Sequence, residues 1–206
     1  MKEKRPYRMR KRLKSQDETR RRIVEAAMRL HEEIGPRATT ISAIAERAGV
    51  QRLTVYRHFP DDTAVFEACT AHWLSLNPPP DPQIWQLVTE PWDRLRKALL
   101  AFYDYYRATQ GMWTVSHRDV AEVPALQGPM TDFAAFVATV ADDLAKPLRS
   151  GKEQARSVRI TLQHALTFLA WSDLEGRGLS NPQKVELVQL WLRAMTQPGA
   201  GLKASE

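Results

Sequence analysis

The sequence has only one cysteine, Cys69, and only 9 glycines in 206 residues. A single cysteine excludes an internal disulfide bond and a cysteine-built metal centre. No glycine-rich phosphate loop, HExxH pair or CxxC pair occurs, so the usual signatures of nucleotide-binding and metal-dependent enzymes are missing. No apolar run approaches the ~20 residues that span a bilayer. We therefore expect no enzymatic activity, no cofactor, no metal and no membrane contact.

Three potentially catalytic side chains, Ser116, His117 and Asp119, lie close together in the sequence. At these spacings they do not face one another on a helix, so they do not form a triad among themselves. The N-terminus is basic and continues into polar residues, which is not typical of a signal peptide. We expect a cytoplasmic protein.

Apolar residues recur at helical spacing, and no segment alternates apolar and polar residues as a half-buried strand does. The hydrophobic share of 43% is enough for a buried core. Both features predict an all-α fold.

Positive charge is concentrated in the N-terminal part of the chain. Residues 1–60 carry a net charge of +9, whereas residues 61–206 carry −3. Eight of the first 14 residues are Lys or Arg, and such a block repels itself. We expect residues 1–16 to be a disordered basic arm that follows DNA phosphates or enters the minor groove. The alternative is a solubilising tail.

Residues 40–59 carry the most informative pattern, which predicts two short helices around a turn. The first has an apolar face at helical spacing, formed by Ile41, Ile44, Ala45 and Ala48. Thr40 can cap its first turn, and Gly49 ends it because glycine adopts positive φ without strain. The second has an apolar back of Val55, Tyr56 and Phe59 and a polar front of Gln51, Arg52, Thr54, Arg57 and His58. Such a helix suits the DNA major groove; the alternative is an ordinary helical hairpin with solvated polar faces.

Two runs of residues carry a resemblance to a known family. Ala48-Gly49-Val50 followed by Thr54-Val55-Tyr56-Arg57-His58-Phe59 resembles the DNA-binding domain of the TetR family of transcriptional regulators. The run from Arg22 to Ala27, with Leu30 and Gly35, is similar to the first helix of that family. The resemblance implies a three-helix DNA-binding unit with a helix-turn-helix, followed by a helical ligand-binding and dimerisation unit.

The resemblance also indicates which residues meet DNA. We expect base contacts from Gln51, Arg52 and Leu53, with Arg57 and His58 as further candidates, and backbone contacts from Thr40, Thr54 and Tyr56. Three residues depart from the family pattern, namely Gln51, Leu53 and Asp62. Asp62 stands where a lysine often meets a phosphate, and its carboxylate would repel the DNA backbone. The basic arm is expected to offset this loss.

A proline-rich segment, residues 77–82, cannot be helical and separates two units. Residues 17–76 are predicted to form the DNA-binding domain with a connecting helix, and residues 83–198 the second domain. Within the second domain we expect a long helix over 152–174 and a last helix that begins near Ser180. Both are unusually apolar, which favours a four-helix interface between two copies of the chain. A monomeric bundle is the alternative.

The second domain is rich in aromatic residues, and the family resemblance implies a small-molecule cavity there. The candidates for its lining are Phe102, Tyr103, Tyr106, Trp113, His117, Phe136 and Phe168. The alternative is that these rings form a helical core. If Asp104 or Asp119 faces the cavity unpaired, a flat cationic or neutral ligand is expected. Otherwise both aspartates pair with arginines or face water.

Taken together, these features predict a sequence-specific transcriptional regulator. We expect a homodimeric repressor that binds a palindromic operator in double-stranded DNA and is released by a small-molecule effector. The alternative is a basic nucleic-acid-binding module without ligand control. The two differ in their specificity for an operator over scrambled DNA, with a ratio of ~10³ or more expected only for the first.

Overall fold

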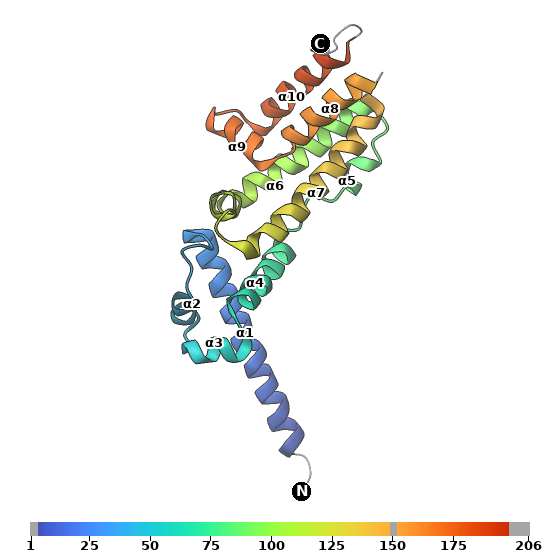
Figure 1. Ribbon diagram of the computed structural model, residues 1–206. Coiled ribbons are helices and arrows are strands. Elements are labelled where there is room, and N and C mark those ends of the chain that lie inside the picture. The colour runs from blue at the N-terminus through green and yellow to red at the C-terminus, as the bar shows by residue number, and fades with distance from the viewer. Residues whose placement is uncertain (1–3, 149–151, 198–206) are drawn as a thin grey trace. The chain divides into compact units, whose positions relative to one another are not determined.

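The computed structural model describes residues 4–148 and 152–197. These residues form helices and connecting loops, and no strand occurs among them (Figure 1). In chain order the α-helices are α1 (Lys4–Ile34), α2 (Ile41–Ala48), α3 (Arg52–His58), α4 (Asp62–Leu76), α5 (Gln83–Gln86), α6 (Pro91–Asp119), α7 (Pro124–Ala145), α8 (Lys152–Ala165), α9 (Phe168–Gly176) and α10 (Asn181–Thr196). A short 3₁₀ helix, η1 (Lys146–Leu148), follows α7. The all-α prediction is confirmed.

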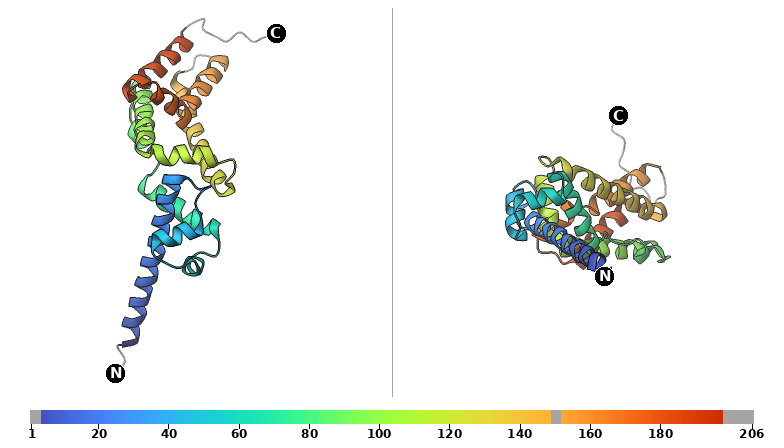
Figure 2. Two further views of the ribbon diagram at one scale, coloured as in Figure 1. Left: turned by 90° about the vertical axis from the view of Figure 1, so that its left-hand side faces the viewer. Right: turned by 90° about the horizontal axis from the view of Figure 1, so that it is seen from below.

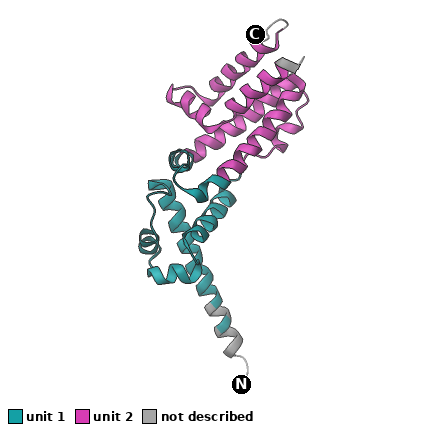
Figure 3. Ribbon diagram, viewed as in Figure 1, with its two compact units in different colours: residues 1–78, 111–128 teal, residues 79–110, 129–206 magenta. Residues whose placement is uncertain are grey.

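The chain divides into two compact units (Figure 3). Unit 1 comprises residues 1–78 and 111–128, and unit 2 comprises residues 79–110 and 129–206. The first boundary, after Pro78, lies within the proline-rich segment 77–82. The return of residues 111–128 to unit 1 has no counterpart in the predicted domains, because it depends on contacts between distant parts of the chain.

The N-terminal helix α1 is continuous from Lys4 (Figure 2). This corrects the expected disorder of residues 1–16 for the described part of that segment; residues 1–3 lie outside it. Lysine, arginine, methionine and leucine are good helix formers, and extending an existing helix requires no new nucleus. The packed part of α1, from Ile23 onward, supplies that nucleus. Helix elongation therefore prevails over the repulsion between the basic side chains.

Unit 1 has its own hydrophobic core, in which α1 packs against α2 and α4. Its buried members include Ile23, Ala27, Leu30, Ile44, Val55 and Cys69. His31 is buried as well, with its Nδ1 3.4 Å from Cys69 Sγ. Burial lowers the pKa of His31 to about 4 and raises the pKa of Cys69 to about 12. Both side chains are therefore neutral members of this core at neutral pH.

A kink divides α6 near the point where the chain passes from unit 2 to unit 1. Thr109 has non-helical dihedral angles, φ −118° and ψ 16°, and its hydroxyl donates to the carbonyl of Tyr105 at 2.6 Å. Hydroxyl bonding to the carbonyl four residues earlier bends helices. The kink in α6 is therefore centred on Thr109.

The long helix expected over residues 152–174 is two helices, α8 and α9. Thr167 caps α9, since its hydroxyl accepts from Ala170 N–H at 3.3 Å. The break leaves carbonyl groups at the end of α8 without helical partners. Two tyrosines of α6 satisfy them: Tyr103 donates to the carbonyl of Ala165 at 3.0 Å, and Tyr106 donates to the carbonyl of Leu166 at 2.7 Å. The break is thus stabilised by residues far away in the sequence.

Candidate nucleic-acid interface

The turn between α2 and α3 forms as its sequence predicts. The Thr40 hydroxyl caps α2 by accepting from Ala43 N–H at 3.2 Å. Gly49 ends α2 in the left-handed region at φ 64° and ψ 41°, and Val50 N–H donates to the carbonyl of Ala45 at 2.9 Å. A hydroxyl that accepts one bond still has its proton to donate. Thr40 therefore keeps a donor for a phosphate oxygen while it caps the helix.

Helix α3 presents most of its side chains to solvent. Val55 is fully buried and Phe59, which follows the helix, is 2% exposed, so these two residues anchor α3 on unit 1. Leu53 is 79% exposed and Tyr56 is 39% exposed, so Tyr56 does not belong to the apolar back. Gln51, Arg52 and Arg57 are also exposed. An exposed leucine costs free energy unless a partner covers it.

The remaining candidates on α3 are less accessible. Thr54 and His58 are half-buried, and Nε2 of His58 is covered by the protein without a hydrogen-bond partner. Burial lowers the pKa of His58, and the nearby charges of Arg57 and Arg20 lower it further. His58 is therefore less suited to reading a base edge than the exposed residues at the start of α3.

The first residues of α4 are acidic and already engaged. Asp61 caps the helix, with its carboxylate accepting from Ala64 N–H at 2.8 Å. The Tyr56 hydroxyl lies 3.4 Å from the carboxylate of Asp62, to which it donates. The departure at Asp62 thus affects a neighbouring residue that was itself expected to meet the DNA backbone.

The end of α6 is bound to the end of α1 within unit 1. Asp119 is 1% exposed and accepts from Arg37 N–H at 3.1 Å and from Arg118 Nε at 2.7 Å. Arg118 also donates to the carbonyl of Ile34, the last residue of α1, at 2.8 Å. Gly35 makes this approach possible, since its φ of +90° and missing side chain leave space for both groups. This connection joins residues 34–37 to residues 118–119.

Five of the seven ligand-lining candidates pack together in unit 2. Phe102 stacks on Phe136 with ring centres 5.8 Å apart, and Tyr106 meets Phe168 edge-on at 5.6 Å. Tyr103 is fully buried, with its hydroxyl on the end of α8. Phe102, Tyr103, Tyr106 and Phe168 are buried in unit 2, and Phe136 is half-buried.

The other two ligand candidates, Trp113 and His117, belong to unit 1. Their ring centres lie 5.8 Å apart. Burial lowers the pKa of His117. Two of the seven candidates therefore belong to unit 1 and five belong to unit 2.

The two aspartates considered for ligand recognition both have partners. Asp119 pairs with Arg118, as the alternative interpretation has it. Asp104 is exposed and accepts from Nδ2 of Asn181 at 2.7 Å. Neither is a buried, unpaired carboxylate, so the argument for a cationic ligand loses its basis.

Across residues 4–148 and 152–197, no group of His, Cys, Asp and Glu side chains is arranged to hold a metal ion, and no helix is long and apolar enough to cross a membrane.

Comparisons with known proteins agree with this geometry. The family described as bacterial regulatory proteins, tetR family, matches residues 23–69, which span the packed part of α1, the two helices α2 and α3 and half of α4. An uncharacterised HTH-type transcriptional regulator of Bacillus subtilis (strain 168), YvkB, is 44% identical over 50 residues, which are 24% of this chain. The matched stretch spans 26% of that protein.

Solved structures resemble the whole fold at low sequence identity. A TetR-like transcriptional regulator from Rhodococcus sp. RHA1 has a TM-score of 0.64 at 16% identity, over 85% of this chain and 93% of that chain. NalD of Pseudomonas aeruginosa, the secondary repressor of the MexAB-OprM multidrug efflux pump, has a TM-score of 0.56 at 18% identity, over 93% and 100%.

The proteins named in these comparisons are transcriptional regulators. The family match includes α2, the turn at Gly49 and α3, and the similarity in fold to the Rhodococcus regulator covers 85% of the chain. Residues 23–69 thus match the tetR family of bacterial regulatory proteins, and the fold of the chain resembles that of TetR-like regulators.

Proposed function

We propose that this protein is a sequence-specific DNA-binding regulator that reads its operator with α3. The proposal depends on the exposed front of α3. Gln51, Arg52 and Leu53 are exposed to solvent there. Val55 and Phe59 are buried and fix α3 to unit 1. Arginine recognises guanine and glutamine recognises adenine through two hydrogen bonds each, and an apolar group contacts the thymine methyl. Residues of these types at the start of a short helix are suited to major-groove reading.

The test is selection of DNA from a random pool by the purified full-length protein. We expect a palindromic sequence, bound ~10³-fold or more tightly than scrambled DNA of the same length. Comparable affinity for both duplexes would instead support the basic module without sequence preference. Binding should be compared at a fixed salt concentration, because phosphate contacts make every affinity depend on salt.

Two substitutions on α3 separate base contacts from backbone contacts. Arg52→Ala should relax specificity at one position of each half-site, at a cost of about 1–3 kcal/mol for the preferred base. Tyr56→Phe should weaken binding to all sequences by a similar factor, since its hydroxyl is expected to position the backbone. The two roles are contradicted if Tyr56→Phe changes the selected sequence at unchanged stability.

We also propose that the regulator is a homodimer formed through α8 and α10. These two helices pack against each other, with Gln154 of α8 donating to the carbonyl of Met195 of α10 at 2.8 Å. They carry large apolar side chains in solvent: Ile160 is 50% exposed and Leu190 is 64% exposed. Covering such side chains with a second copy removes apolar surface from water, and a two-fold dimer explains a palindromic operator.

Sedimentation of variants tests the dimer. Ile160→Asp and Leu190→Asp should each shift the protein towards monomer, because they place a charge in the proposed interface. Leu87→Asp is the matched control, since Leu87 is 88% exposed and lies outside α8 and α10. Equal sedimentation of all three variants and the unmodified protein would argue against this interface.

Repression and release by a small molecule complete the proposal. NalD, which shares the fold, is named as a repressor of an efflux pump, and this supports a repressor role here. The aromatic cluster of unit 2, with Phe102 and Tyr106 at its centre, supports a site for flat apolar compounds. A ligand that releases DNA must itself bind more weakly when operator is present, by the same factor. Quenching of tryptophan fluorescence by aromatic compounds, with and without operator, measures that factor. Equal affinity in both titrations would remove ligand control and leave DNA binding intact.

A further inference from the structure

Arg20 is held beside the recognition helix by an aromatic ring. Its guanidinium carbon lies 4.4 Å from the ring centre of Phe59, the residue that directly follows α3. Arginine stacks on aromatic faces through its planar and weakly hydrated guanidinium group. The ring therefore keeps a positive charge from α1 next to the C-terminal end of α3.

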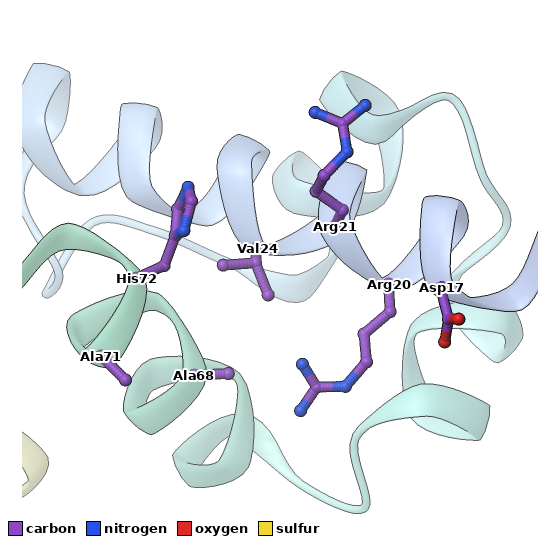
Figure 4. A pocket seen from close by; sticks show the side chains of 7 residues that line it. All are labelled: Asp17, Arg20, Arg21, Val24, Ala68, Ala71 and His72. Atoms are coloured by element: carbon purple, nitrogen blue, oxygen red, sulfur yellow. The ribbon is translucent and has the colours of Figure 1, made fainter. Parts of the chain in front are cut away.

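The neighbouring Arg21 has a different environment. It forms ion pairs with Glu18 and with Glu25, each at 2.6 Å. Arg20 forms no ion pair with any carboxylate of residues 4–148 and 152–197. Figure 4 shows the two side chains pointing to opposite sides of α1. Arg20 is thus an exposed cation without an ion pair in the described part of the chain, whereas Arg21 pairs with two glutamates.

Further positive charge lies close to Arg20. Arg57 of α3 and Arg20 both act on His58, whose pKa they lower in addition to the effect of burial. Like charges that lie together destabilise the free protein and gain free energy when an anion binds between them. The end of α3 and this turn of α1 therefore carry two positive charges, those of Arg57 and Arg20, on either side of a neutral His58.

The N-terminus of α4, next to these two arginines, cannot supply a cation. Asp61 uses its carboxylate as the helix cap, and Asp62 accepts from the Tyr56 hydroxyl. Both carboxylates offset the positive end of the helix dipole, which would otherwise attract a phosphate. A phosphate that approaches the end of α3 therefore needs a positive group from another element, and α1 provides it.

There is room for a phosphate group beside Arg20. An open hollow of about 440 Å³ lies between α1 and α4, and it is lined by Asp17, Arg20, Arg21, Val24, Ala68, Ala71 and His72 (Figure 4). The alanines of α4 leave this space unfilled, and Asp17 is the acidic group on its rim. The guanidinium of Arg20 is accessible from it.

We propose that Arg20 is a phosphate-contacting residue of the operator complex, positioned by Phe59 at the end of α3. The proposal rests on the proposed DNA-binding function and adds a specific contact to it. Arg20 supplies from α1 a positive charge that the start of α4 does not provide, because Asp62 is acidic. It positions the protein on the DNA backbone and does not read bases.

The experiment compares Arg20→Met with Arg21→Met in the full-length protein. Methionine keeps most of the packing on Phe59 and removes the charge, so both variants change the net charge equally. Affinity for the selected duplex is measured by fluorescence anisotropy over a series of salt concentrations. Arg20→Met should flatten the slope of log affinity against log salt by about 0.9 for each lost phosphate contact. A change of about 0.9 in the slope corresponds to roughly 8-fold weaker binding at about 0.1 M salt for each lost contact.

The matched variant makes the result specific. Arg21→Met leaves Glu18 and Glu25 uncompensated, so it should weaken binding at least as much as Arg20→Met if only long-range charge matters. Equal slopes for both variants, or an unchanged slope for Arg20→Met, overturn the proposal. A changed base preference in Arg20→Met also overturns it, because a phosphate contact carries no sequence information.

Failure of the proposed function is recognised separately. If the unmodified protein has no sequence preference, the regulator proposal fails, but the two slopes on any duplex still test the phosphate contact. Arg20→Lys provides a second check. It keeps the charge and loses the planar fork, so its slope should stay near that of the unmodified protein while its affinity falls a few-fold. A flattened slope for Arg20→Lys would contradict the contact.

Discussion

The carboxylate of Asp119 links the end of α6 to the end of α1, and its removal should destabilise unit 1. We predict that Asp119→Asn lowers the free energy of unfolding by about 2 kcal/mol at neutral pH. Asp119 is 1% exposed and accepts from Arg37 N–H at 3.1 Å. A hydrogen bond to a charged acceptor contributes about 1.5–3 kcal/mol. The Arg118 pair adds little, because the Arg118 side chain is 56% exposed and solvent screens it.

The effect should depend on pH in a defined direction. The hydrogen bond from Arg118 lowers the pKa of Asp119 below its usual 3.8, against the opposing effect of burial, and the Arg37 amide lowers it further. A carboxylate with a lower pKa in the folded state stabilises the fold above its unfolded-state pKa. That stabilisation is lost as the pH falls through the folded-state pKa. The difference between the two proteins should therefore be largest at neutral pH and should shrink in acid.

The measurement is urea-induced unfolding, followed by circular dichroism at neutral pH and at about pH 3. Exchange of the Arg37 amide hydrogen reports the same contact locally and should become faster in Asp119→Asn. Asp173→Asn is the control, because Asp173 pairs with Arg177 at 3.1 Å on the surface, with side chains 64% and 68% exposed. The reasoning is refuted if Asp119→Asn is as stable as the unmodified protein at neutral pH. A deficit that persists unchanged in acid would also refute it.

Two further substitutions test the packing of each unit. Gly35→Ala places a methyl group 2.0 Å from Arg118 Nη2 and 2.3 Å from Asp119 Oδ2 at a φ of +90°. It should lower the free energy of unfolding in urea by at least about 1–3 kcal/mol. A variant as stable as the unmodified protein would contradict the close approach of Arg118 and Asp119 to Gly35. Lys184→Met removes a fully buried ammonium group that donates to Glu175. It should cost about 3 kcal/mol in thermal or urea unfolding, and a neutral or stabilising effect would show that the ion pair is dispensable.

The helix-turn-helix was predictable because its determinants are local. Thr40 caps α2 through an amide three residues away, and Gly49 takes the positive φ that few other residues tolerate. The apolar spacing of α2 then decides which face is buried. Each of these contacts spans less than one turn of chain, so the residue types and their order contain the necessary information.

Other features were not predictable, because they depend on residues that meet only in the folded chain. In the sequence, residues 152–174 look like one apolar helix. The structure has a break there, between α8 and α9. The break is stabilised by Tyr103 and Tyr106, whose hydroxyls come from α6. The sequence also offers these two tyrosines as cavity residues, because an aromatic-rich helix does not reveal whether its hydroxyl groups donate to the backbone or to a ligand.

The charge of α1 illustrates the same limit. The sequence presents a run of basic residues, and charge alone predicts a disordered arm that acts on DNA as a whole. In the folded chain the helix continues through that run, so consecutive arginines point in different directions and have separate environments. Arg21 is compensated by two glutamates, whereas Arg20 reaches Phe59 beside the recognition helix. Net charge determines how strongly an anion is attracted at long range, but the contact with a particular phosphate depends on which arginine is left unpaired and where a ring holds it.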